Sequence, residues 1–151
     1  MTSFKLKDPE YQARVRASFE RQEAMKTLRI EIVRLEPGDI ELAMPYSDCY
    51  TQQHGFVHAG IVATALDSAC GYAAFSLMPA DAAVLTVEFK INLVAPAKGE
   101  RFLFGARVVK AGRTITVCEG RAVAVGAEGE KLVATMTGTM MAVFDRGGIR
   151  H

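Results

Sequence analysis

The chain has 151 residues, of which 50% are hydrophobic, and its formal net charge is +1. This length and composition predict a single domain over residues 1–151 with a sizeable core, an N-terminal helix within 1–27 and a loose tail over 145–151. The near-neutral charge without a basic run argues against a nucleic-acid partner, and the N-terminus lacks the apolar stretch of a secretory leader, so we expect a cytoplasmic protein.

The first predicted element is a helix over residues 9–26. Asp8 is suited to cap its N-terminus, and Pro9 is suited to the first helical position. Val15 and Phe19 lie one turn apart, with charged residues elsewhere. This amphipathic pattern predicts a helix that packs one face against the rest of the domain.

Two strands, 28–36 and 39–46, are predicted next, joined by the turn dipeptide Pro37-Gly38. In the second strand, apolar residues alternate with polar or small ones, which is the pattern of a strand with one buried face. Residues 47–57 then form a polar loop that leads into the longest apolar segment of the chain.

Residues 59–80 are apolar or small on nearly every side, which predicts a buried central helix that ends at Pro79. The segment is long enough to cross a bilayer, but Asp67 and the many small residues favour a buried helix in a globular domain without a membrane partner. An unpaired ionised carboxylate in apolar surroundings is costly, so Asp67 requires a partner or a function.

Four further strands are predicted over 84–93, 101–110, 114–125 and 131–144. In the first of them the odd-numbered residues are apolar and the even-numbered residues from Thr86 to Asn92 are polar, so we expect the two sets on opposite faces. Strands grouped around one buried helix predict an α+β domain in which an antiparallel sheet curves around the helix.

The loop and the start of the central helix resemble the hotdog-fold acyl-CoA thioesterases, in their phenylacetate-type (PaaI-like) branch. That family carries a polar amide, a glycine, the sequence His-Gly-Gly at the start of the long helix, and an acidic residue about two turns later. The corresponding residues here are Gln52, Gly55, His58-Ala59-Gly60 and Asp67. Two positions depart from the pattern: Ala59 replaces the first glycine, and Gln52 stands where asparagine is common.

The resemblance extends over residues 28–144, with 85–96 similar to the family's long strand and 110–113 similar to its usual hairpin. It implies hydrolysis of an acyl-CoA substrate without a metal or an organic cofactor. It also implies a homodimer, paired into a dimer of dimers, with active sites at the dimer interface. The open edge of strand 84–93 is consistent with this, because two-fold pairing there would cover both edges.

Asp67 is the predicted general base or nucleophile; its structural alternative is a carboxylate that caps a loop or bridges a dimer. The backbone N–H of Ala59 or Gly60, at the positive end of the helix dipole, could hold the developing oxyanion. Ordinary close packing of helix on sheet is the structural alternative for these two residues.

His58 is expected to orient the loop or to contact the thioester carbonyl, and a hydrogen-bonded core histidine is the alternative. Gln52 could place the water or the carbonyl, or could be a solvated loop residue. By the resemblance, Thr86 orients the water through its hydroxyl, although an ordinary strand threonine would look the same. Four cations could meet the phosphates of coenzyme A or could be plain surface charges: Lys98, Arg101, Lys110 and Arg113.

His54 and His58 have the spacing of a metal-binding pair, but Gly55 disfavours a helix between them and no third ligand is evident. The sequence therefore predicts no metal site. The three cysteines are odd in number and lack CxxC spacing, which predicts free thiols in a reducing compartment rather than a disulfide framework or a zinc site. They are Cys49, Cys70 and Cys118.

We therefore predict an acyl-CoA thioesterase, with a medium- or long-chain fatty acyl group favoured and an aromatic acyl group as the alternative. A hotdog dehydratase is a second alternative, although such enzymes usually carry a Pro/Gly-rich loop and a glutamate on the helix. A non-catalytic acyl-CoA-binding module is a third, although residues 1–27 are too short for the DNA-binding segment that such modules usually append. The sequence leaves open whether Asp67 attacks the carbonyl or activates water.

Overall fold

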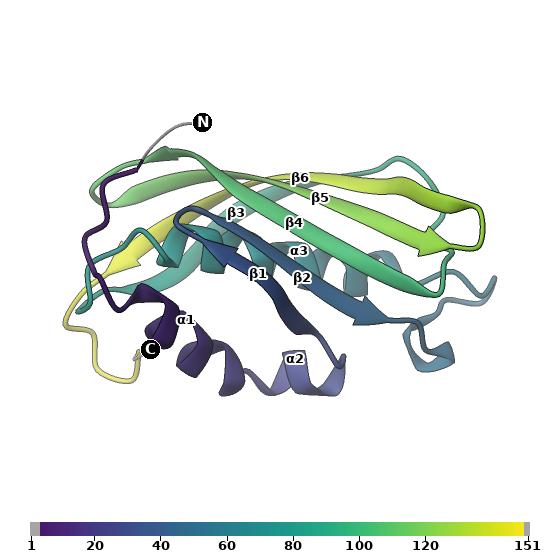
Figure 1. Ribbon diagram of the computed structural model, residues 1–151, viewed down its shortest axis with the longest axis horizontal. Coiled ribbons are helices and arrows are strands. Elements are labelled where there is room, and N and C mark those ends of the chain that lie inside the picture. The colour runs from purple at the N-terminus through teal and green to yellow at the C-terminus, as the bar shows by residue number, and fades with distance from the viewer. Residues whose placement is uncertain (1–3, 150–151) are drawn as a thin grey trace.

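The computed structural model describes residues 4–149 and consists of one sheet curved around a central helix (Figure 1). Residues 1–3 of the predicted N-terminal segment and residues 150–151 of the predicted tail lie outside the described range. The helices are α1 (Tyr11–Glu20), α2 (Glu23–Thr27), the short 3-10 helix η1 (Asp48–Tyr50) and α3 (Ala59–Phe75). The strands are β1 (Glu31–Glu36), β2 (Asp39–Pro45), β3 (Ala83–Leu93), β4 (Arg101–Ala111), β5 (Ile115–Gly126) and β6 (Gly129–Val143).

The six strands form one antiparallel sheet in the order β1-β2-β4-β5-β6-β3. Strands β1 and β3 are therefore its edges within one chain. Helix α3 lies against one face of this sheet and packs mainly against strands β2 to β6 (Figure 1). The predicted α+β class, with an antiparallel sheet around one buried helix, is confirmed.

The core lies between α3 and the inner face of the sheet. The helix is lined with small residues, and Ala65, Ala69 and Ala73 have no exposed surface. The sheet approaches it closely at Gly120, where an added Cβ would lie 3.2 Å from both the Cys70 Sγ and the Leu66 Cδ2. Short side chains on both elements thus allow the helix to sit deep in the curve of the sheet.

The N-terminal segment differs from the prediction, because it forms two helices instead of one. Gln22 is extended between them, with φ −83° and ψ 97°. After this break the Met25 side chain points into the core, where it is 1% exposed. Phe19, before the break, is also buried, at 8% exposed. Helix α1 also begins at Tyr11 and not at Pro9, since the Asp8 carboxylate accepts the Glu10 N–H at 2.9 Å in a turn before the helix.

Helix α1 is held to the C-terminal end of α3 by the partly buried Arg14. Its Nη2 donates to the carbonyl oxygens of Phe75 (3.2 Å) and Met78 (2.8 Å), which lie at a helix end that lacks its own donors. Its Nε donates to Asp8 at 2.6 Å. Burial alone would raise the pKa of Asp8, but the hydrogen bonds from Arg14 and the Glu10 N–H, with the Arg14 charge, outweigh it and lower that pKa.

The predicted bounds of the other elements need only small corrections. The first strand begins at Glu31, since Leu28 ends α2, and the central helix ends at Phe75, four residues before Pro79. The turn at Pro37-Gly38 is present, with Gly38 at φ +73°, a conformation that favours glycine. None of the helices among residues 4–149 combines the length and hydropathy needed to span a bilayer.

Strand β3 does not keep the single alternation that was predicted. Its register with β6 shifts between Thr86 and Glu88, so that Val87 is an extra residue in a β-bulge. Thr86 pairs with Met140 of β6, whose side chain is fully buried in the core. Directly paired residues of neighbouring strands point to the same face of the sheet. Thr86 therefore lies on the inner face, and its assignment to the face of Lys90 and the other polar residues is wrong because the bulge inverts the pattern.

Candidate active site

A compact loop places His58 at the start of α3. The loop is closed by an isolated bridge between Thr51 and Val57 and by the Gln52 N–H, which donates to the Phe56 carbonyl at 2.9 Å. Its tip contains Gly55 at φ +80°. His58 then follows in an extended conformation (φ −60°, ψ 137°), which is the geometry of an N-cap residue.

The His58 ring caps the helix directly, because its Nδ1 accepts the Gly60 N–H at 2.9 Å. A neutral ring that accepts through Nδ1 carries its proton on Nε2, which leaves Nε2–H free to donate to a ligand. The Gly60 N–H is thereby occupied. Within the described range the Ala59 N–H has no acceptor, so Ala59 is the better candidate for an oxyanion contact.

Gln52 is fixed by the same loop. Its Oε1 accepts the His54 N–H, which orients the amide and leaves its NH₂ group without a partner among residues 4–149. Gln52, His58 and Ala59 line one hollow of about 600 Å³ at the N-terminal end of α3. The rest of its wall is mainly apolar and comes from the loop, α3, the end of β3 with the residues that follow it, and β6: Gln53, Phe56, Val57, Val62, Leu93, Val94, Ala95, Pro96, Ala97 and Val133.

Asp67 lies half-buried in the middle of α3, next to the bulge in β3. The Thr86 hydroxyl donates to Asp67 Oδ1 at 2.8 Å and also lies 3.4 Å from the Met140 sulfur. Burial raises the pKa of Asp67, and the Thr86 hydrogen bond offsets part of that rise. No described residue bonds to Oδ2, so the carboxylate is held by one oxygen and presents the other.

Two polar residues near Asp67 were not identified from the sequence. The Ser68 hydroxyl donates to Gln22 Oε1 at 3.0 Å, which ties the junction of α1 and α2 to the helix beside the carboxylate. A serine in an apolar helix was the only signal of this contact, and nothing in the sequence indicated that the N-terminal helix breaks at Gln22.

The structure divides the predicted site residues into two groups. Gln52, His58 and Ala59 lie together, and Asp67 and Thr86 lie together. Asp67 follows Ala59 by eight residues, which is about 12 Å along the helix axis at 1.5 Å per residue. A base or nucleophile and an oxyanion donor must both reach the same carbonyl within about 3 Å, so the two groups of one chain cannot act on one thioester.

The four candidate phosphate-binding cations do not gather in one chain. Lys98 and Arg101 lie at the end of the sheet nearest the start of α3, because the Val57 N–H donates to the neighbouring Ala97 carbonyl at 3.0 Å. Lys110 and Arg113 lie at the far end of β4, about 30 Å away at 3.3 Å per strand residue.

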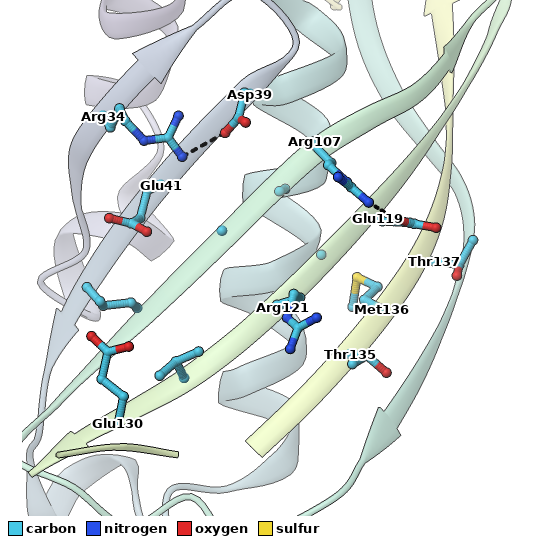
Figure 2. A pocket seen from close by; sticks show the side chains of 15 residues that line it. Arg34, Asp39, Glu41, Arg107, Glu119, Arg121, Glu130, Thr135, Met136 and Thr137 are labelled. Atoms are coloured by element: carbon cyan, nitrogen blue, oxygen red, sulfur yellow. Dashed lines mark hydrogen bonds and ion pairs between the residues drawn. The ribbon is translucent and has the colours of Figure 1, made fainter. Parts of the chain in front are cut away.

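A second hollow, of about 770 Å³, lies on the outer face of the sheet, on the opposite side from α3 (Figure 2). Its charged side chains largely neutralise one another: Arg34 pairs with Asp39 at 2.7 Å and Arg107 with Glu119 at 3.2 Å (Figure 2). It contains none of the predicted site residues. We therefore place the candidate chemistry at α3 and not in this larger hollow.

Within residues 4–149, His54 and the cysteines take no part in either group. The His54 Nε2 lies 3.4 Å from the Gln53 Nε2, and no set of three His, Cys, Asp or Glu residues in the range 4–149 could hold a metal ion. The cysteines are free thiols, as predicted, with Cys49 exposed and Cys70 and Cys118 buried. Burial raises the pKa of both buried thiols, that of Cys118 to about 12, which makes them unreactive.

Comparison with known proteins identifies the family. The sequence profile of the thioesterase superfamily matches residues 54–129. A thioesterase family protein from Silicibacter pomeroyi has a similar crystal structure: it is 60% identical, the match covers 89% of this chain and 98% of that one, and the TM-score is 0.88. The E. coli PaaI protein of the phenylacetic acid degradation operon shares the fold at 21% identity, with 89% and 94% coverage and a TM-score of 0.79.

A candidate esterase from Saccharolobus solfataricus is 33% identical over 94 residues, which are 62% of this chain and 66% of the relative. The match thus spans just under two thirds of the length of this curated relative. The resemblance drawn from the loop and helix motif is confirmed, and so is the hotdog fold. This chain belongs to the thioesterase superfamily.

Proposed function

We propose that the protein hydrolyses acyl-CoA thioesters to the free acid and coenzyme A, with Asp67 as the general base or the nucleophile. The observation that most supports this proposal is the Asp67–Thr86 pair. The Asp67 carboxylate is half-buried, its Oδ1 accepts the Thr86 hydroxyl at 2.8 Å, and its Oδ2 is open to a ligand. Its raised pKa makes it a stronger proton acceptor than an ordinary aspartate. Membership in the thioesterase superfamily supports hydrolysis as the reaction class.

The complete site is proposed to form between two copies of the chain. Strand β3 is a free edge with exposed apolar side chains, among them Leu85 (37%), Val87 (54%) and Phe89 (41%). Two-fold pairing of two β3 edges would cover these surfaces and join two sheets into one. It would also allow Asp67 of one copy to approach the α3 N-terminus of the other, which one chain cannot achieve by itself.

In this arrangement the thioester oxygen accepts the N–H of the partner subunit's Ala59, at the positive end of the helix dipole. With Asp67 as base, Oδ2 takes a proton from water while the water oxygen bonds to the carbonyl carbon. The tetrahedral intermediate then collapses, the C–S bond breaks, and the proton passes to the departing thiolate. With Asp67 as nucleophile, Oδ2 bonds to the carbonyl carbon, and the C–S bond breaks to release the thiolate of coenzyme A. Water then cleaves the resulting anhydride to the free acid, which restores the Asp67 carboxylate, and the proton released passes to the thiolate.

A medium- or long-chain fatty acyl group is the proposed substrate, because the hollow beside the start of α3 is lined mainly by aliphatic side chains. Lys98 and Arg101 lie at the same end of the molecule, where they are available to the phosphates of coenzyme A. An aromatic acyl group would also fit such a wall, so phenylacetyl-CoA belongs in the assay panel.

The test of the activity is free-thiol release from a panel of acyl-CoAs from acetyl to palmitoyl, with phenylacetyl-CoA and crotonyl-CoA included. We expect release without added metal and undiminished in EDTA. Release from none of them would refute the enzyme and favour a binding module, and hydration of crotonyl-CoA would favour a dehydratase. Activity lost in EDTA and restored by zinc would refute the cofactor-free reaction.

The shared site is tested by mixing two inactive variants. Asp67→Asn removes the base, and Ala59→Pro removes one N–H at the first helical position, where proline is tolerated; the His58 ψ of 137° is compatible with a following proline. Ala59→Val adds similar bulk, keeps the N–H and serves as the matched control.

Co-expressed one to one, the two variants form mixed dimers in which one of the two sites is intact, so about a quarter of wild-type activity should return. No recovery in verified mixed dimers would place both groups in one chain and refute the shared site. Light scattering supplies an independent check, because a 16.4 kDa monomer at micromolar concentration would refute the dimer.

A further inference from the structure

Gly71 lies one turn beyond Asp67 on the same face of α3, in the interior of the helix. Glycine is unfavourable there, and usually either a left-handed backbone or a close neighbour accounts for it. Gly71 has neither: its φ is not positive, and a Cβ built on it would meet no described atom within 4 Å. Nothing in one chain therefore requires a glycine at this position.

The open space over Gly71 lies one helical turn from the Asp67 carboxylate, on the same face of α3. Gly71 and Asp67 are both half-buried, whereas Ala69 and Cys70 between them are buried. The described polar contacts at this level of α3 are the hydrogen bond from Thr86 of β3 to Asp67 and that of 3.0 Å from Ser68 to Gln22. A group bound at Asp67 can thus extend over Gly71 without displacing any side chain.

The shared site of the proposed function, on which this inference rests, fixes what faces Gly71. If Asp67 is level with the partner subunit's Ala59 on antiparallel helices, then Gly71, four residues further, lies about 6 Å beyond the start of the partner's helix, on the side of the loop that contains the partner subunit's Phe56. Phe56 lines the apolar hollow at the start of α3. The partner's helix begins at Ala59 and so does not extend over Gly71.

We propose that Gly71 is a specificity-determining residue: its missing side chain leaves room for the acyl chain of the substrate. The thioester carbonyl lies at Asp67, and the acyl chain passes over Gly71 towards the apolar hollow of the partner subunit. The pantetheine arm is disfavoured there, because its two amide groups need hydrogen-bond partners and this hollow is mainly aliphatic.

The proposal predicts a loss that depends on acyl length. Each methylene of a bound chain contributes about 0.8 kcal/mol, a factor of about 4 in kcat/KM. Gly71→Ala should therefore lower kcat/KM about 4-fold for acyl groups long enough to reach Gly71, and Gly71→Leu by more than ~100-fold. Acetyl-CoA, which is too short, should be hydrolysed at close to the wild-type rate by both variants.

Folding does not confound this test, because alanine is the better helix former and no described atom opposes its methyl group. Gly71→Ala should raise Tm by about 2–4 °C. Gly147→Ala is the matched control: Gly147 also has no atom near its would-be Cβ and no positive φ, but it lies in the segment after β6. This control should leave every acyl-CoA unaffected.

The experiment measures kcat/KM of each variant over the series from acetyl-CoA to palmitoyl-CoA, with dimer dissociation followed by sedimentation. A penalty at Gly71 that is equal for all lengths would refute the proposal and place another part of the substrate there. Weaker dimerisation without any length dependence would refute it and assign Gly71 to subunit packing. An unchanged profile for Gly71→Leu would also refute it.

Calorimetric binding of the same acyl-CoA series separates this proposal from the proposed function. If the wild type hydrolyses none of them, the hydrolase proposal fails, yet Gly71 is still tested by affinity. Affinity that falls with acyl length in Gly71→Leu but not in Gly147→Ala would sustain the acyl-chain role, and parallel affinities in the two variants would refute it.

Discussion

Replacing Asp67 by asparagine is the most direct perturbation of the candidate site. The side chain keeps its size, and its Oδ1 can still accept the Thr86 hydroxyl that donates at 2.8 Å in the native protein. What disappears is the negative charge and the proton-accepting oxygen Oδ2. If Asp67 is the general base or the nucleophile, kcat should fall by at least ~100-fold. Substrate affinity should change little, because the Ala59 N–H and the apolar hollow are untouched.

Stability should respond in the opposite direction. Burial outweighs the Thr86 hydrogen bond and raises the pKa of Asp67, so the ionised group opposes folding at neutral pH. Asparagine removes that cost but exchanges a charge-assisted hydrogen bond for a neutral one, and the net gain should lie between zero and about 1 kcal/mol. The gain should vanish as the pH falls below the unfolded value of about 3.9, where Asp67 is protonated in both states.

The assay therefore needs two measurements on one sample: kcat for the best acyl-CoA, and urea unfolding at pH 7 and at pH 3.5. A variant that is clearly destabilised at pH 7 and yet turns over at a near-native rate would refute the reasoning. Asp67 would then be a structural carboxylate, and His58 would be the main remaining candidate for catalysis.

Three further predictions concern residues around this site and Arg14 of helix α1. Thr86→Val removes the hydrogen bond that lowers the pKa of Asp67, so the acid limb of the kcat/KM profile should move to higher pH, and an unmoved limb would refute the pairing. His58→Asn retains an N-cap acceptor, so Tm should stay unchanged while kcat falls. His58→Ala removes the acceptor as well and should also cost about 1 kcal/mol of stability. Equal activity in His58→Asn and the wild type would limit the role of His58 to capping the helix. Arg14→Ala leaves Asp8 buried without its cation and should cost about 3–5 kcal/mol in urea unfolding, with kcat per folded molecule unchanged.

The sequence determined the architecture and singled out the candidate site residues, because both inferences depend on local patterns. A long segment without a polar face predicts a buried helix, and alternating strands around it predict a sheet that curves over that helix. One carboxylate in that segment, preceded by the polar loop from Gln52 to His58, was enough to identify the candidate site and the family resemblance. The turn at Pro37-Gly38 follows from the same local chemistry.

The roles of individual atoms depended on tertiary contacts. The β-bulge at Val87 places Thr86 on the inner face beside Asp67, and an inserted residue is invisible to a period-two pattern. The His58 ring accepts the Gly60 N–H and so leaves the Ala59 N–H as the candidate donor. The sequence did not predict this contact, because histidine is not among the residues preferred at an N-cap. The break at Gln22 likewise follows from the need to bury Met25, a demand set by the core and not by the helix itself.

The separation of the site into two groups is the clearest case of a property that only three dimensions decide. In the sequence, Ala59 and Asp67 lie eight residues apart and read as one motif. On a rigid helix that spacing becomes about 12 Å, beyond the reach of a single carbonyl group. The sequence thus supplies both groups of the candidate site, and the geometry of the helix keeps them apart within one chain.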